Sequence, residues 1–316
     1  MGLEQSASGM NRGALNRLLP VRVWALAFGC VIGWGSFVMP GTTFLPDAGP
    51  LGTVIGVAVA AVMTLVICVN YAYLAQRMPV DGGSYAYTKK LLGNDHAFLA
   101  VWSLALAYIS LLWANATAFV LIGRFFLGDV LQRGFHYTIA GYDIFWGEVL
   151  ATVLILVLFG LLICFAKKAA TVIRTVLAAA LFVLIVVLFA GILLRGSGTV
   201  SFTPHFSDGA SKGTQILNIA ILAPWLFVGF ETVNFERVSS SRRKVFLYAG
   251  AAILTGMLAY IMLTLIGASG VPEGYRDWQE YVSDLGNLRG MEAMPVLFNA
   301  ESALGIWQCH LVSRFC

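Results

Sequence analysis

Seven apolar runs of membrane-spanning length occupy most of this 316-residue chain. A transmembrane helix needs about 20 consecutive apolar residues, because it rises about 1.5 Å per residue across a hydrocarbon core of about 30 Å. The runs cover residues 23–45, 52–75, 97–122, 147–166, 170–194, 215–235 and 245–269. Hydrocarbon offers the backbone no hydrogen-bond partners, so each run is expected to be helical. The pattern predicts an all-α, polytopic membrane protein.

The composition excludes several other classes of protein. Only 11% of the residues are charged and 59% are hydrophobic, whereas soluble domains carry about 25% charged residues. The net charge of +4 is spread over the connections, so no nucleic-acid partner is expected. The cysteines and histidines show no metal-ligand spacing, and the chain has no nucleophile elbow, phosphate loop or paired carboxylates. We therefore expect no catalytic residues, no metal, no other cofactor and no enzyme activity.

The connections between the runs predict the orientation of the chain. Basic residues precede the first run and follow the second, fourth and sixth: Arg12, Arg17, Arg22, Arg77, Lys89, Lys90, Lys167, Lys168, Arg237, Arg242, Arg243 and Lys244. The alternate connections carry acids: Asp47, Glu273, Asp277, Glu280 and Asp284. Because basic loops stay in the cytoplasm, the amino terminus is expected there. We expect a multi-pass protein of the plasma (inner) membrane.

The first run holds the residues least suited to a continuous helix. Gly29–Gly41 contains four glycines and Pro40, and each glycine costs a helix about 1 kcal/mol and the proline about 3 kcal/mol. A break there would present the backbone N–H groups of Gly33, Gly35 and Ser36 at the positive end of a half-helix, where a carboxylate binds well. The alternative is that the glycines only allow neighbouring helices to pack closely.

A second break is predicted in the sixth run, at Ala223–Thr232. Pro224 removes a helix hydrogen bond, and Gly229 precedes the acidic residue Glu231. Glu231 lies eleven residues before Arg242, or roughly 16 Å along a helix, which places it near mid-membrane. An ionisable residue at that depth is a functional hypothesis, here as a partner for a substrate ammonium or as a proton carrier. The alternative is a structural carboxyl bonded to a neighbouring helix.

The two breaks lie at matching depth in spans that run in opposite directions. Such a pair indicates an inverted-repeat secondary transporter whose substrate binds between two discontinuous helices. The expected organisation is a cytoplasmic segment (1–22), a first repeat of spans 1–5 (23–196), the start of a second repeat with spans 6 and 7 (197–270), and an external loop with an atypical tail (271–316). The tail Ser302–Cys316 does not form an eighth span.

Three segments resemble the amino acid–polyamine–organocation permeases. They are Gly29–Gly41, Gly229–Thr232, and the cytoplasmic turn Pro79-Val80-Asp81-Gly82-Gly83-Ser84-Tyr85. The resemblance covers about residues 20–270 and implies a leucine-transporter-type inverted-repeat fold that carries amino acids or related amines by alternating access. Members of that family usually continue for more spans, so the chain is expected to be the amino-terminal part of a member, truncated after about seven transmembrane helices.

The resemblance also implies roles for individual residues. By matching positions, Gly33, Trp34, Gly35 and Ser36 hold the substrate carboxylate, and Phe230, Glu231 and Thr232 hold the amino group and form the gate. Trp34 is a departure, because the family usually has a small residue there. The expected partners are an amino acid or amine substrate, the lipid bilayer, and either a proton or a counter-substrate for coupling. Two other classes stay open: a seven-span receptor or sensor, and a truncated membrane protein without function.

Overall fold

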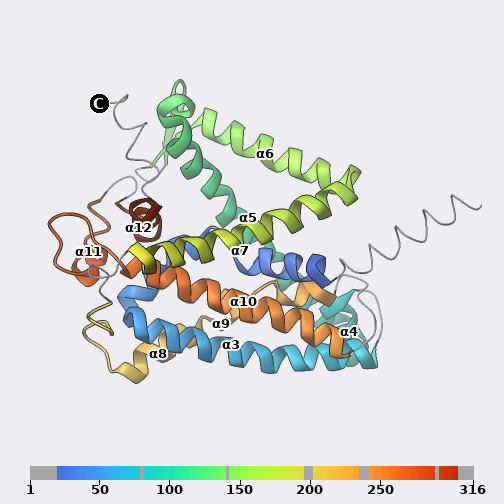
Figure 1. Cartoon of the computed structure of the whole chain (residues 1–316). Coiled ribbons are helices and arrows are strands. Elements are labelled where there is room, and N and C mark those ends of the chain that lie inside the picture. The colour runs from blue at the N-terminus through green and yellow to red at the C-terminus, as the bar shows by residue number, and fades with distance from the viewer. Residues whose placement is uncertain are drawn as a thin grey trace, which may run out of the picture. The chain divides into compact units, whose positions relative to one another are not determined.

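The structure, a computed structural model, describes residues 20–78, 82–139, 142–195, 202–234, 242–288 and 292–304 (Figure 1). The polar amino-terminal segment before Pro20, residues 79–81 of the cytoplasmic turn, the connection around Arg237 and the tail after Leu304 lie outside the described residues. Residues 1–87 and 174–316 belong to one compact unit, and residues 88–173 belong to a second.

The first unit is built from helices that come from both ends of the chain. Its elements are the helix Pro20–Val31, α2 (Gly35–Met39), a π-helical turn (Pro40–Phe44), α3 (Leu45–Arg77), the start of α4 (Gly83–Leu92), α7 (Lys167–Arg195) from Arg174 onward, α8 (Lys212–Ile221), α9 (Ala223–Leu226), a 3-10 turn (Phe230–Asn234), α10 (Arg242–Ala268), α11 (Trp278–Ser283) and α12 (Pro295–Leu304). The long helix α3 packs against both α8 and α10 (Figure 1).

Small residues on α3 allow its neighbours to approach closely. A Cβ atom added to Gly56 would lie 2.6 Å from the Cβ of Ile219 on α8. One turn further along, Ala60 and Ala61 are fully buried in the core of the unit. Lipid tails are as apolar as the side chains, so helix association in a bilayer depends on close van der Waals contact of this kind.

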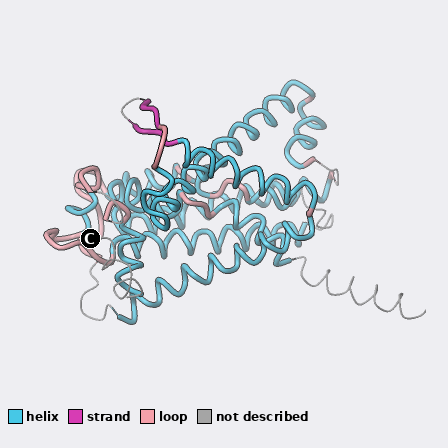
Figure 2. The backbone as a smooth tube through the Cα atoms, turned by 90° about the horizontal axis from the view of Figure 1, so that it is seen from above, coloured by secondary structure: helices cyan, strands magenta, loops and turns pink. Residues whose placement is uncertain are grey.

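The second unit contains two apolar helices and one hairpin. It is formed by α5 (Asn94–Leu127), a 3-10 turn (Gly128–Gln132), β1 (His136–Ile139), β2 (Tyr142–Phe145), α6 (Trp146–Phe165) and the first residues of α7. The two strands pair antiparallel, from His136 opposite Phe145 to Ile139 opposite Tyr142. This hairpin is magenta in Figure 2, and it connects the two helices of the unit.

Within the described residues, five helices are long and apolar enough to cross a bilayer: Gly35–Arg77, Asn94–Ala116, Trp146–Phe165, Lys167–Leu194 and Arg243–Ala268. The prediction of an all-α polytopic membrane protein is confirmed. The runs predicted at residues 23–45 and 52–75 are connected by helix and not by a loop. At Gly49, φ is 67° and ψ is 179°, so the chain kinks between them without opening into a loop. The sixth run is divided into α8, α9 and the 3-10 turn.

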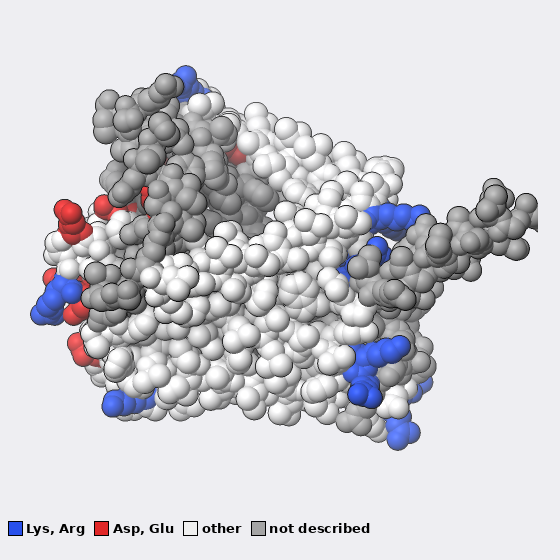
Figure 3. Space-filling view, in the orientation of Figure 1, with Lys and Arg blue, Asp and Glu red and all other residues white. Residues whose placement is uncertain are grey.

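The two ends of the first unit differ in charge. In Figure 3 the acidic side chains of this unit gather at the end where α11 lies, whereas most of its lysines and arginines lie at the opposite end. Between the two ends, the visible surface in Figure 3 carries few charged side chains. This distribution is typical of a helix bundle whose ends lie in two aqueous phases.

Candidate functional site

The first helix of the unit is interrupted where the glycines lie. The helix Pro20–Val31 ends before Ile32, and α2 begins at Gly35. Across the interruption, Ser36 N donates to Gly33 O at 3.1 Å and Phe37 N donates to Trp34 O at 2.9 Å. These i to i+3 bonds form a tighter turn than an α-helix has. The backbone of Ile32–Trp34, which we name the first interruption, is therefore non-helical at the predicted place.

A π-helical turn follows α2 directly. It begins at Pro40, whose ring cannot donate a backbone hydrogen bond. Next to it, a Cβ atom added to Gly41 would lie 2.9 Å from Cδ of Pro295 on α12. Single π-helical turns often occur at functional sites. The sequence placed Pro40 among the breakers, but it gave no sign that the backbone would widen into this form.

The second interruption, Phe227–Gly229, separates α9 from the 3-10 turn. Gly229 has φ of 109°, a conformation that favours glycine. Its N–H donates to Oε2 of Glu231 at 2.9 Å, and its carbonyl accepts the hydroxyl of Thr232 at 2.6 Å. Glu231 is only 6% exposed. The carboxylate therefore accepts a hydrogen bond from the backbone of its own turn.

The second interruption contacts the helix end that precedes the first interruption. A Cβ atom added to Gly229 would lie 2.2 Å from the Cβ of Cys30 and 3.3 Å from its carbonyl carbon. Cys30 is two residues before the first interruption, and Gly229 is the last residue of the second. Segments about 200 residues apart in the chain are thus in direct contact, where the second interruption meets the end of the helix before the first.

Tyr260 of α10 joins the same two segments. Its hydroxyl lies 3.0 Å from the carbonyl oxygen of Val31 and 3.2 Å from that of Leu226. One turn earlier on α10, a Cβ atom added to Gly256 would lie 2.7 Å from Cγ1 of Val31. Sequence reasoning missed Tyr260, because a tyrosine within an apolar run is usually a packing residue. The available signal was its hydroxyl, which needs a hydrogen-bond partner when it is buried.

Two glycines on either side of the first interruption, Gly29 and Gly35, are not in close contact with a neighbouring helix. A Cβ atom added to Gly29 or to Gly35 would have no heavy atom within 4 Å among the described residues. The neighbouring Ser36 is 2% exposed. Its hydroxyl lies near that of Tyr260, yet Oγ has no hydrogen-bond partner in the described part of the chain. Open space beside Gly35 and an unsatisfied buried hydroxyl are both features of a binding site.

The remaining predicted residues lie on the same two segments. Gly33 and Trp34 are half-buried, and Trp34 stacks on Phe37 with ring centroids 6.4 Å apart. Phe230 is 8% exposed and meets the ring of Tyr71 edge-on at 5.5 Å. Of the seven predicted residues, Gly33 and Trp34 lie in the first interruption, and Gly35 and Ser36 begin α2 directly after it. Phe230, Glu231 and Thr232 lie in the 3-10 turn directly after the second interruption.

A half-buried basic residue near the interruptions, Arg174, was also missed. Arg174 of α7 is seven residues beyond Lys167, where the helix begins, or roughly 10 Å along its axis. Arg174 and Glu231 both act electrostatically on Cys30. Arg174 lies in the same helix as Lys167 and Lys168, two turns further along, so it resembled an ordinary basic residue near the end of a span. Among the described residues, no group of three His, Cys, Asp or Glu side chains is placed to hold a metal ion.

Comparison with known proteins gives one family. The family described as "Amino acid permease" matches residues 18–285. Cationic amino acid transporter 3, mitochondrial, of Arabidopsis thaliana is 26% identical over 298 residues, which cover 89% of this chain and 47% of that protein. The arginine/ornithine antiporter of Pseudomonas aeruginosa is 28% identical over 270 residues, which cover 83% and 51%. Human cationic amino acid transporter 4 is 27% identical over 280 residues, which cover 84% and 42%. The chain spans about half the length of these relatives.

Proposed function

Because the chain belongs to the amino acid permease family, we propose that it takes part in secondary active transport of amino acids or related amines by alternating access. The observation that carries the proposal is the backbone contact between two interrupted helices, at Gly229 and Cys30. Broken helices free backbone N–H and C=O groups inside the membrane, where they form a polar site for a charged substrate. A leucine-transporter-type inverted repeat would place such a site between spans 1 and 6.

We assign the two ends of the substrate to the two interruptions. The N–H groups of Gly33, Trp34, Gly35 and Ser36 would receive the carboxylate, since space lies open beside Gly35 and the Ser36 hydroxyl lacks a partner. Phe230, Glu231 and Thr232 would receive the amino group and close over it. The carboxylate of Glu231 supplies negative charge in a buried position, where its attraction for an ammonium group is stronger than in water.

The relatives guide the choice of substrate. Two are named as cationic amino acid transporters and one as an arginine/ornithine antiporter. We therefore propose a basic amino acid as the first substrate to test, with a counter-substrate or a proton as the coupling partner. A plasma (inner) membrane location belongs to the same proposal; one relative is named as mitochondrial.

Equilibrium binding tests this function. The chain is reconstituted into liposomes and titrated with radiolabelled L-arginine, L-ornithine and a panel of neutral amino acids and polyamines. Gly35→Leu would fill the open space beside the first interruption, and Glu231→Ala would remove the buried charge, so both should abolish binding. Ser110→Ala is the control, because this serine of α5 bonds only to the carbonyl of Leu106 on its own helix. Normal binding in both site variants at equal expression would refute the assignment.

A further inference from the structure

Tyr260 makes a contact that the function described above does not use. The side chain is buried, and its hydroxyl has two acceptors. Val31 O, at 3.0 Å, belongs to the last residue of the helix Pro20–Val31, and Leu226 O, at 3.2 Å, belongs to the last residue of α9. A single side chain of α10 therefore reaches the carbonyl group that closes each helix immediately before its interruption.

The chemistry of these carbonyl groups explains why a hydroxyl is needed. The last carbonyl groups of a helix have no hydrogen-bond donors within the helix, because no further turn follows. When they are buried, as Val31 and Leu226 are, an unsatisfied carbonyl group is costly. Tyrosine has one O–H proton, so Tyr260 shares it between both acceptors.

The position of the ring is fixed by its neighbours. Phe44 meets it edge-on at 5.9 Å and Phe227 at 6.2 Å. The absence of a side chain at Gly256 lets Val31 approach the same face of α10. The hydroxyl is thus held where both carbonyl groups can reach it.

We propose that Tyr260 is a positioning residue, which holds the two interruptions at the spacing that the substrate site requires; this inference rests on the proposed function. Because one proton serves two acceptors, the hydroxyl keeps one carbonyl group satisfied when the other moves away. That property suits a contact that must open and close during transport. Tyr260 acts through the backbone of Val31 and Leu226, not by touching the substrate.

Cys30 offers a direct reporter of this spacing. It adjoins Val31, and its Cβ packs on Gly229 across the contact. In a chain with Cys68, Cys164, Cys309 and Cys316 replaced by alanine or serine, the rate of Cys30 alkylation by N-ethylmaleimide is measured. Tyr260→Phe should raise that rate about fivefold, since it removes the hydrogen bond and keeps the ring. Tyr248→Phe is the matched control, because this half-buried tyrosine of α10 has no hydrogen-bond partner among the described residues.

A second reporter separates a local effect from general loosening. Cys68 of α3 is buried in the same unit, and its alkylation is followed in a chain that keeps only that cysteine. The proposal predicts a faster rate at Cys30 alone. Equal rates for wild type and Tyr260→Phe at Cys30, or a parallel rise at Cys68, would overturn it.

The affinity for L-arginine tests whether Tyr260 affects the proposed substrate site. Tyr260→Phe should raise the Kd for L-arginine about fivefold with the number of sites unchanged, because it loosens the spacing without removing a binding group. An unchanged Kd would also overturn the proposal. If the wild-type chain binds no arginine, the proposed substrate fails, while the Cys30 rates still decide whether Tyr260 sets the spacing.

Discussion

Position 229 requires glycine because of its backbone conformation and its close approach to Cys30, and its backbone groups are also hydrogen-bonded. Its φ of 109° is unfavourable for any residue with a side chain, and its Cα faces Cys30 so closely that a Cβ atom would overlap at 2.2 Å. Its N–H and C=O are bonded to Glu231 and Thr232, so the backbone cannot relax without losing those bonds. One residue therefore fixes both the shape of the second interruption and its contact with the first.

Gly229→Ala should lower the free energy of unfolding by roughly 2–4 kcal/mol, from the left-handed conformation and the overlap with Cys30 together. The measurement is the Tm in detergent, which should fall by several degrees. Gly250→Ala serves as the control, because its added Cβ would meet Leu65 at an ordinary 3.5 Å within a regular helix. An equal Tm for the two variants would show that the close contact at Gly229 is absent.

A second prediction at the residue scale concerns the external loop. Tyr275 donates a hydrogen bond to Asp284, which raises the pKa of Tyr275 to about 12; the bonds from Tyr275 and Asn287 hold the pKa of Asp284 below its usual value. The Asp284 contribution to stability is therefore present above the unfolded pKa of about 3.9 and is lost as pH falls through the lower folded pKa. The Tyr275 contribution is present below about pH 10 and is lost as pH rises towards 12.

Tyr275→Phe should move the pKa of Asp284 upward, towards the ordinary aspartate value, because the largest cause of its depression is removed. The measurement is a carbon-13 NMR titration of aspartate-labelled protein, with the Asp284 signal assigned from Asp284→Asn. Tyr85→Phe provides the comparison, since Tyr85 lies on α4, far along the chain from this loop. A pKa that stays low in Tyr275→Phe would exclude the hydrogen bond as its cause.

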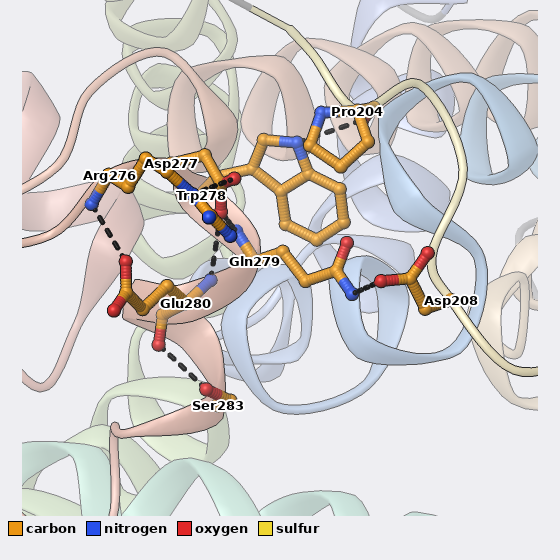
Figure 4. A network of polar contacts seen from close by, with 8 residues as sticks. All are labelled: Pro204, Asp208, Arg276, Asp277, Trp278, Gln279, Glu280 and Ser283. Atoms are coloured by element: carbon orange, nitrogen blue, oxygen red, sulfur yellow. Dashed lines mark hydrogen bonds and ion pairs between the residues drawn. The ribbon is translucent and has the colours of Figure 1, made fainter.

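At the scale of elements, a polar network joins the connection before the sixth span to the one after the seventh (Figure 4). Trp278 Nε1 donates to Pro204 O at 2.9 Å, and Gln279 Nε2 donates to Asp208 Oδ2 at 2.7 Å. Asp277 begins α11 as its cap, because its Oδ1 accepts the N–H groups of Gln279 and Glu280. The short helix α11 thus presents the two side chains that reach the other connection.

Asp277→Ala should destabilise α11 and make its local opening more frequent, because a lost N-cap costs about 1 kcal/mol. Hydrogen–deuterium exchange of residues 278–283 should become about fivefold faster, the factor that this free energy corresponds to. Ser283→Ala is the control, since its exposed hydroxyl bonds only to the carbonyl of Glu280 within α11. Unchanged exchange in Asp277→Ala would mean that contacts with the other connection hold α11 without the cap.

Much of the helical architecture was predictable, because apolar length alone determines whether a helix can span. The interruptions near Gly33 and Gly229 were also predictable, since glycine and proline act on the local backbone. The hairpin β1–β2 was not, because short strands form through pairing that a single segment does not reveal. The kink at Gly49 and the roles of Tyr260 and Arg174 depend on neighbours distant in sequence, such as Phe206, Val31 and Cys30.

At the scale of the whole molecule, charge separates the two ends of the first unit (Figure 3). The proposed orientation places the basic end and the amino terminus in the cytoplasm. In a cysteine-free chain, Ser8→Cys should react with a membrane-impermeant maleimide only after the cells are permeabilised, whereas Glu273→Cys should react in intact cells. Labelling of Ser8→Cys in intact cells would reverse the topology and favour a seven-span receptor or sensor.

The central claim is that the two interruptions and the residues directly after them form one substrate site. It is tested most directly by whether L-arginine protects Cys30, the residue at their contact, from alkylation. In the chain that keeps only Cys30, saturating L-arginine should slow the reaction with N-ethylmaleimide several-fold, and Glu231→Gln should remove that protection. Binding of L-arginine with no change in the Cys30 rate would place the site elsewhere and contradict the account.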